Sequence, residues 1–176
     1  LLGSPASGAG IVAVGSTVNR ASFTCIQPAP NDVQNLVERQ FSPVTSAPTG
    51  TVPQVAGNLS HFSNPGPPRG TRRNIGAMAP GGFVMSALSA QARGNPVGTV
   101  WSPASEVDAL TLCISGTSMA APMITGIAAC LLESRPNMDF TEFQERLKRA
   151  STLPGGANAD DWGPGRLDAS RLPTVL

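Results

Sequence analysis

The stretch Ser115-Gly116-Thr117-Ser118-Met119-Ala120-Ala121-Pro122 is the most informative part of this chain. It places a serine at the start of an apolar segment, residues 119–132, whose composition predicts a buried helix. Ser118 is then expected at the helix N-terminus, where free N–H groups and the positive end of the helix dipole stabilise a nearby oxyanion. Gly116 is expected to allow close backbone approach, and Pro122 to lie in the first turn, which needs no internal N–H bonds.

Length and composition limit the classes of protein to consider. With 176 residues, the chain forms one domain or a large part of one. Its 40% hydrophobic content can supply a core, while 13% charged residues and a net charge of +1 argue against nucleic acid or an anionic surface as the main partner. The apolar run at 119–132 is shorter than a membrane span, and the first residues do not form a signal peptide. Secretion as part of a longer, processed precursor stays open.

The three cysteines, Cys25, Cys113 and Cys130, do not have the spacing of metal ligands. Cys130 falls within the apolar helix, so we expect a buried free thiol there. Cys25 and Cys113 form a candidate pair that the sequence cannot establish, and an odd number of cysteines also permits a bridge to another segment.

The amino-terminal half predicts one strand followed by a long surface insertion. Residues 10–15 are a short apolar run bounded by glycines, which is typical of a strand buried on both faces of a parallel sheet. Residues 16–57 are rich in Pro, Ser, Thr, Asn and Gln, and we expect a surface insertion there. Within it, the helical spacing of apolar residues over 33–41 predicts one short helix, with Asn31 or Asp32 as its N-cap.

The remaining segments alternate between strands and helices. Strands are expected at 59–62, at 74–78 before a turn over 79–82, and at 83–88, with an extended segment at 110–114. After the apolar helix, Asp139 and Glu142 resemble a capping box and predict a second helix. A short strand and a final turn are expected over 166–172. This order predicts an α/β architecture in which helices cover a mostly parallel sheet.

Several motifs resemble the C-terminal half of the subtilisin-like serine proteases, in the order of that family. They cover nearly the whole chain: Ile11-Val12-Ala13-Val14-Gly15-Ser16, Ser60-His61-Phe62-Ser63-Asn64-Pro65-Gly66, Ala79-Pro80-Gly81, Gly116-Thr117-Ser118-Met119-Ala120-Ala121-Pro122 and Gly163-Pro164-Gly165-Arg166-Leu167-Asp168. The sedolisins also use a Gly-Thr-Ser nucleophile, but Met119 and the ending at Asp168 favour the subtilisin type. The resemblance implies the subtilisin-like three-layer α/β fold, of which residues 1–176 supply the C-terminal part of the catalytic domain.

The same resemblance implies roles for individual residues. Ser118 would be the catalytic nucleophile that forms an acyl-enzyme, and its own N–H would be one oxyanion donor, assisted by the Thr117 hydroxyl. Ser115 stands where the family usually has Asn, so it and Gly116 would contact substrate. An ungapped match places Gly3 at the floor of the primary specificity pocket, with Ser4-Pro5 at a cis-proline position.

The partners of this serine are not visible in the chain. A subtilisin-type triad follows the order Asp, His, Ser, so the Asp, the His and the oxyanion Asn are expected upstream of residue 11. The sole histidine, His61, falls in the Phe-Ser-Asn match and is expected to be a surface residue. We therefore expect the C-terminal fragment of a secreted endopeptidase zymogen, nicked before Leu1, associated with an upstream segment and inactive alone.

The residues leave other functions open. One is a catalytically silent subtilisin-like binding subunit, although a binding module does not need Ser118. Another is an esterase or acyl transferase that uses the same serine. The reaction needs no cofactor; the family often binds structural calcium, but no motif locates a site here, and Asp160-Asp161 is expected to be a solvated pair.

Overall fold

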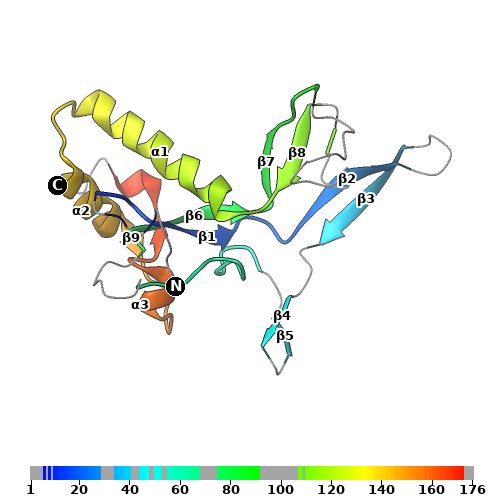
Figure 1. Ribbon diagram of the computed structural model, residues 1–176, viewed down its shortest axis with the longest axis horizontal. Helices are drawn as coiled ribbons and strands as arrows, with labels where there is room; N and C mark the ends of the chain where they lie inside the picture. Colours follow the sequence, from blue (N-terminus) through cyan, green and yellow to red (C-terminus); the bar gives the residue numbers. More distant parts are fainter. Residues whose placement is uncertain are drawn as a thin grey trace.

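The computed structural model describes residues 6, 8, 10–28, 34–40, 44–47, 50–52, 55–67, 75–91, 107–108 and 110–172, with side chains left undescribed in the strands between residues 22 and 52. Its elements, shown in Figure 1, are β1 (Val14–Val18), β2 (Ser22–Pro28), β3 (Gln34–Gln40), β4 (Val44–Ala47), β5 (Gly50–Val52), β6 (Ala77–Gly82), β7 (Val84–Ala87), β8 (Thr111–Ile114), α1 (Thr117–Ser134), α2 (Phe140–Ala150), β9 (Ser151–Thr152), α3 (Ala159–Trp162), β10 (Arg166–Leu167) and the short 3₁₀-helix η2 (Ala169–Arg171).

The main sheet has the strand order β1-β6-β10-β9. β6 pairs in parallel with β1 on one side and with β10 on the other, and only β9 runs antiparallel. Met78 lies at the centre of this sheet, opposite Gly15 on β1 and Arg166 on β10. The α/β class and the mostly parallel sheet that the sequence predicts are therefore confirmed.

Strand boundaries differ from the sequence-based expectation. The strand predicted over 10–15 begins at Val14 and continues to Val18, and Ile11 before it is 40% exposed. The strand predicted over 74–78 is β6, which starts at Ala77 and includes the residues 79–82 that were expected to form a turn. Pairing with β1 extends this strand, since the β1–β6 register continues to Gly82 despite the turn-favouring Pro and Gly residues.

A single apolar cluster joins the sheet to α1 and α2. Its buried members are small or branched side chains from β6, both helices and the C-terminal turn: Ala77, Ala79, Ala120, Ile124, Leu131, Leu147, Ala150 and Leu172. α1 packs against both β1 and β6. The expectation of a fully buried helix is wrong for α1, because only Ala120, Ile124 and Leu131 are buried.

The second helix begins where the capping pattern places it. The Asp139 carboxylate accepts a 2.8 Å hydrogen bond from the Glu142 N–H, and this satisfies one of the amides left free at the start of α2. One turn later the buried Arg146 forms an ion pair of 2.8 Å with Glu142. These contacts hold the fully buried Leu147 against the cluster.

The described parts of the segment between β1 and residue 57 are mostly strands, so the predicted helix over 33–41 is wrong. β3 occupies Gln34–Gln40 and pairs antiparallel with β2, with Val37 opposite Cys25 and Leu36 opposite Ile26. The apolar spacing fits either structure locally, and pairing with the distant β2 decides in favour of a strand. β4 and β5 form a second hairpin. In Figure 1 the β2–β3 hairpin extends away from the main sheet.

The segment returns to the sheet beside the end of β1. Leu59 forms an isolated antiparallel bridge with Thr17, so the strand predicted over 59–62 is reduced to one bridge. Hydrogen bonds of buried serine hydroxyls hold residues 60–63 against β1. Ser63 Oγ accepts from the Ser16 N–H at 3.0 Å, and the hydroxyl oxygens of Ser16 and Ser60 are 2.9 Å apart. The insertion predicted over 16–57 thus overlaps β1 at residues 16–18, and the ends of the segment that follows, at Val18 and at residues 57 and 58, meet beside β1.

The described residues test some of the remaining predictions. Cys130 carries a free but exposed thiol, so its predicted burial is wrong; Cys113 is buried. The strand predicted over 83–88 and the extended segment at 110–114 are confirmed as β7 and β8, which pair antiparallel. Gly3, the Ser4-Pro5 peptide and the side chain of Cys25 lie outside the described residues.

Candidate active site

The turn before Ser118 is held by the end of the main sheet. β8 carries the chain to Ser115 and Gly116, and α1 begins at Thr117. The Gly116 N–H donates a 2.8 Å hydrogen bond to the carbonyl of Gly81 at the end of β6, and the Gly116 carbonyl accepts from the Met119 N–H at 3.0 Å. The nucleophile turn is therefore anchored to β6, a largely buried strand.

The close approach in this turn depends on Gly81 and not, as the sequence suggested, on Gly116. A Cβ at Gly116 would meet the Met119 sulfur at 3.4 Å, an ordinary contact, and the φ of Gly116, 162°, is extended backbone. A Cβ at Gly81 would lie 2.6 Å from the carbonyl oxygen of Gly116 and would also overlap the Ser16 hydroxyl. Only a residue without a side chain lets the two backbones meet here.

Ser118 is exposed as the second residue of α1. Its N–H is one of the first-turn amides that have no partner within the helix. Among the described residues, this N–H donates to no backbone or side-chain acceptor outside the helix. The serine hydroxyl therefore lies beside an available amide donor at the positive end of an 18-residue helix, which is the arrangement that stabilises an oxyanion.

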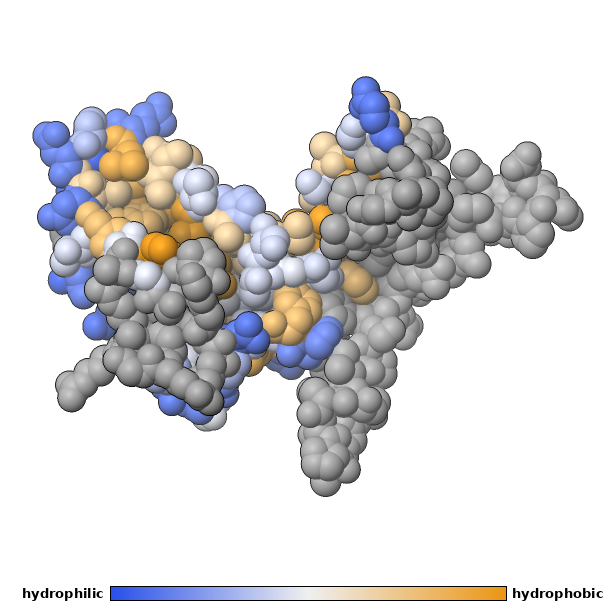
Figure 2. All heavy atoms as spheres, in the orientation of Figure 1, coloured by the Kyte–Doolittle hydropathy of each residue, from blue (hydrophilic) through white to orange (hydrophobic). Residues whose placement is uncertain are grey.

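A hollow of about 310 Å³ lies beside Ser118. It is lined by residues from β7, β8 and the first turns of α1: Val84, Ser86, Ile114, Ser118, Met119, Pro122 and Met123. Figure 2 shows a broad notch between the part of the surface formed by α1 and the part formed by the β7–β8 hairpin. Most of the lining is apolar, so the hollow suits an apolar group placed next to the serine.

Pro122 lies deeper in α1 than the sequence suggested. Because the helix starts at Thr117, Pro122 is in its second turn, where a residue with an N–H would bond to the carbonyl of Ser118. Proline has no N–H, so the Ser118 carbonyl lacks its regular helical donor. The peptide carbonyl of the nucleophile is thereby left available to another donor.

The structure brings some of the predicted site residues together. Ser115 and Ser118 are exposed, Gly116 and Thr117 are half-buried, and all four lie in one turn. The Ser115 hydroxyl oxygen accepts a 2.8 Å hydrogen bond from the Phe83 N–H. His61 is exposed in the segment returning from the insertion, and its ring packs edge-on against Phe62 with the centroids 5.1 Å apart.

Two residues near this turn were not identified from the sequence. Phe83 joins β6 to β7 with a φ of 53°, a left-handed conformation that residues with a Cβ rarely adopt. Asn19, just after β1, donates from its side chain to the Phe83 carbonyl at 3.3 Å. The only available signal was the neighbouring Gly81-Gly82 pair, which indicates an unusual backbone but does not identify Phe83.

Within the described ranges, no group of three or more His, Cys, Asp or Glu side chains is placed to hold a metal ion. The pKa of the exposed Asp168 lies below its ordinary value, chiefly because the Ser170 hydroxyl donates to the carboxylate at 2.6 Å; the Ser170 N–H and the charge of Arg171 add to this effect.

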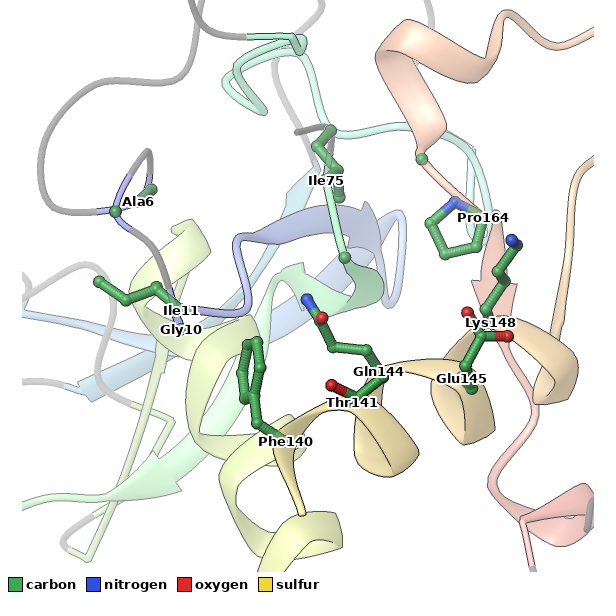
Figure 3. A pocket seen from close by; sticks show the side chains of 13 residues that line it. Ala6, Gly10, Ile11, Ile75, Phe140, Thr141, Gln144, Glu145, Lys148 and Pro164 are labelled. Atoms are coloured by element: carbon green, nitrogen blue, oxygen red, sulfur yellow. The ribbon is translucent and has the colours of Figure 1, made fainter. Parts of the chain in front are cut away.

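Two larger cavities lie away from Ser118. One of about 550 Å³, shown in Figure 3, lies between Ile11, Ile75, Pro164 and the α2 side chains Phe140 and Gln144. Ile11 and Ile75 precede β1 and β6, whereas Ser118 is anchored at the end of β6, so this cavity is at the opposite end of the sheet. Another of about 770 Å³ lies beside the second half of α1, at Met123, Ile127, Cys130, Arg146 and Leu172.

Comparison with known proteins adds sequence relatives and structural neighbours. The halolysin-like extracellular serine protease Nep of Natrialba magadii is 34% identical over 117 residues, which cover 66% of this chain and 17% of that protein. Fervidolysin from Fervidobacterium pennivorans, a keratinolytic enzyme related to subtilisin, matches 98% of this chain and 20% of its own, with a TM-score of 0.55 and 19% identity. The self-cleaved protease domain of PatA matches 97% of this chain and 43% of its own, with a TM-score of 0.50 and 21% identity.

These matches agree with the motifs and with the observed sheet. The two structural neighbours show the fold, and this chain spans less than half the length of each of the three proteins. The model of the subtilase family of peptidases matches residues 2–167, nearly the whole chain. This chain therefore belongs to the subtilase family.

Proposed function

We propose that this chain carries the nucleophile of a serine endopeptidase, with Ser118 as the attacking residue. The observation that supports this most is the exposed hydroxyl of Ser118 at the start of α1, next to an amide N–H without an acceptor among the described residues. A structural serine in a helix N-terminus would use its side chain to cap the helix, whereas α1 has Gly116 at its N-cap and no side-chain cap.

The reaction would proceed through an acyl-enzyme. The Ser118 oxygen attacks the carbonyl carbon of a peptide bond while a histidine base takes the hydroxyl proton. The Ser118 N–H, assisted by the Thr117 hydroxyl, stabilises the oxyanion. The base then returns the proton to the departing amine, and a water molecule hydrolyses the acyl group from Ser118. No cofactor takes part in these steps.

The base, its aspartate and the oxyanion asparagine would come from an upstream segment of the same protease. Support comes from the edge of the main sheet: among the described residues β1 is the terminal strand, and of these only the 57–63 segment contacts its edge, at residues 16–18. A parallel sheet is normally covered on both faces and continued by further strands. The lengths of the relatives leave room for such a segment.

The surface of α1 supports the same proposal. Residues 117–132 include no charged side chain, yet Leu132 is 42% exposed and Ala121, Thr125 and Ala129 are exposed along one face. A helix that is apolar on all sides is normally buried, and small residues allow another helix to approach closely. By length and composition alone α1 is apolar enough to cross a membrane, a test that core helices also pass.

We further propose that the whole protease is extracytoplasmic and is activated from a precursor. The extracellular description of Nep, a relative at 34% identity, supports that location. Polypeptides would be the substrates, with an apolar group bound in the hollow beside Ser118.

The test is labelling with a fluorophosphonate probe, followed by intact mass analysis and peptide mapping. We expect labelling at Ser118 in the protein purified with its upstream segment, none in its Ser118→Ala variant, and little in the chain alone. Absence of labelling in the complete protein would instead favour a silent binding subunit. Turnover of esters without turnover of peptide amides would favour an esterase or acyl transferase.

A further inference from the structure

The corner at Phe83 is strained and lies directly beside the nucleophile turn. Its φ of 53° is unfavourable for a residue with a Cβ, because the side chain crowds the backbone in the left-handed region. Strained residues of this kind persist only where the surrounding structure holds them. Gly81, two residues earlier, accepts the Gly116 N–H, so the corner and the nucleophile turn share one backbone contact.

Side chains from two distant segments hold both polar backbone groups of Phe83. The Ser115 hydroxyl oxygen accepts from its N–H at 2.8 Å, and the Asn19 side-chain amide donates to its carbonyl at 3.3 Å. The backbone of Asn19 adds a third contact, because its N–H donates to the Gly82 carbonyl at 2.9 Å. The Phe83 ring packs against the buried Cys113 on β8.

The corner also determines where one wall of the hollow lies. Val84 follows Phe83 directly and lines the hollow together with Ser86 and Ser118. If the Phe83 backbone relaxed out of its left-handed conformation, the start of β7 would move relative to α1. The Ser115 hydroxyl and the Asn19 amide therefore control the distance between the start of β7 and α1, and with it the shape of the hollow beside Ser118.

We propose that Ser115 and Asn19 are positioning residues, which hold the Phe83 corner and through it the orientation of Ser118. This inference rests on the proposed function, since it concerns the reactivity of that serine. It differs from the expectation that Ser115 contacts substrate, because the role assigned here comes from the hydrogen bond that the Ser115 oxygen accepts from the Phe83 N–H.

The position of Asn19 gives the inference a second consequence. Asn19 is the first residue after β1, and hydrogen bonds between Val18 and residues 57 and 58 join the two ends of the segment that the sequence predicts to be an insertion. The base of the insertion is therefore attached to the same corner as the nucleophile turn. Loss of the Asn19 side-chain amide should affect Ser118 even though Asn19 belongs to another segment.

The test uses the complete protease with its upstream segment. Ser115→Ala removes the acceptor, Ser115→Thr keeps it, and Asn19→Asp removes the donor with little change of shape. Ser134→Ala and Asn158→Ala are matched controls, because each removes a comparable local hydrogen bond at a distance from the corner. The measurements are the rate constant for fluorophosphonate labelling of Ser118, and kcat and KM for a peptide amide.

We expect Ser115→Ala and Asn19→Asp to label about 3- to 10-fold more slowly, as for loss of one hydrogen bond, with an equal fall in kcat and little change in KM. Ser115→Thr and both controls should keep the parent rate. Three results would overturn the inference and leave the proposed function intact. These are an unchanged labelling rate in Ser115→Ala and Asn19→Asp, a change confined to KM, and an equal fall of the labelling rate in the two controls. Failure of the parent protein to label would overturn both. If Ser115→Ala does not fold, the labelling rate and the kcat of Asn19→Asp test the inference.

Discussion

The amide of Gly116 donates a 2.8 Å hydrogen bond to the carbonyl of Gly81, and this contact joins the nucleophile turn to the buried strand β6. The two backbones approach so closely that a Cβ at Gly81 would lie 2.6 Å from the Gly116 carbonyl oxygen. The position of Ser118 therefore depends on a glycine that lies 37 residues earlier in the chain.

Gly81→Ala is expected to lower the free energy of unfolding by about 1–3 kcal/mol, as overpacking in a close-packed region does, and to slow labelling of Ser118. Gly116→Ala is the matched comparison, because its Cβ meets only an ordinary contact with Met119. Urea unfolding and the labelling rate measure the two effects. Equal effects of the two substitutions would contradict the proposed importance of Gly81.

Ser118→Ala should abolish labelling and reduce peptide turnover by about six orders of magnitude, as loss of a triad nucleophile does. Ser118 is exposed and makes no side-chain cap in α1, so the midpoint of unfolding should stay nearly unchanged. Active-site labelling and thermal unfolding of the complete protein provide the check. Residual turnover close to that of the parent would exclude Ser118 as the nucleophile.

Asp139→Ala should destabilise the protein by about 1 kcal/mol, because the Glu142 N–H loses its 2.8 Å acceptor at the start of α2. Asp139→Asn keeps an oxygen acceptor, so its loss of stability should be much smaller. Urea unfolding of both variants measures the difference. The interpretation of Asp139 as an N-cap is wrong if the two variants are equally stable.

The stability of the C-terminal turn should depend on pH through Asp168. Hydrogen bonds from Ser170 lower the folded-state pKa of this carboxyl below its ordinary value. The carboxylate therefore stabilises the fold above the ordinary pKa of Asp, and this contribution disappears as the pH falls through the lower folded-state pKa. Asp168→Asn should be less stable than the parent at neutral pH and should converge with it in acid. Urea midpoints across this range test the sign, and a constant difference at all pH values would contradict it.

The exposed face of α1 offers a test of the upstream segment. Outside its own helix, a Cβ at Gly126 would meet no atom of the described residues within 4 Å, so Gly126→Leu has room here and should only improve the local helix propensity. If another helix covers this face, the same leucine should weaken association of the two segments. Gly155→Leu is the control, because its Cβ is equally unobstructed in a surface turn. Association measured by analytical ultracentrifugation should fall only for Gly126→Leu.

The sequence was informative where structure depends on neighbouring residues. The capping pattern at Asp139 and Glu142 predicted the start of α2, and the apolar run after Ser118 predicted α1. An apolar run bounded by glycines predicted a strand near β1, and a short run before the 79–82 turn predicted one near β6, although both strands have different limits in the paired sheet. These signals are local, so they can be recognised from spacing and residue type alone.

Contacts between residues that are far apart in the sequence could not be predicted in the same way. The spacing of Leu36 and Val37 suits a helix or a strand, and only their partners on β2 decide between them. The exposure of Cys130 likewise depends on which face of α1 meets the sheet, since the helix is apolar on several sides.

By itself, the sequence determined the α/β class, the family and Ser118 as the candidate nucleophile, because motif residues and local periodicity carry that information. Only the tertiary structure decided that Gly81 is the glycine the nucleophile turn needs, that residues 34–40 form a strand, and that Asn19, Phe83 and Ser115 meet. The physical reason is that these contacts join segments tens of residues apart. Their energies depend on backbone approach and strain, which no local pattern of residue types records.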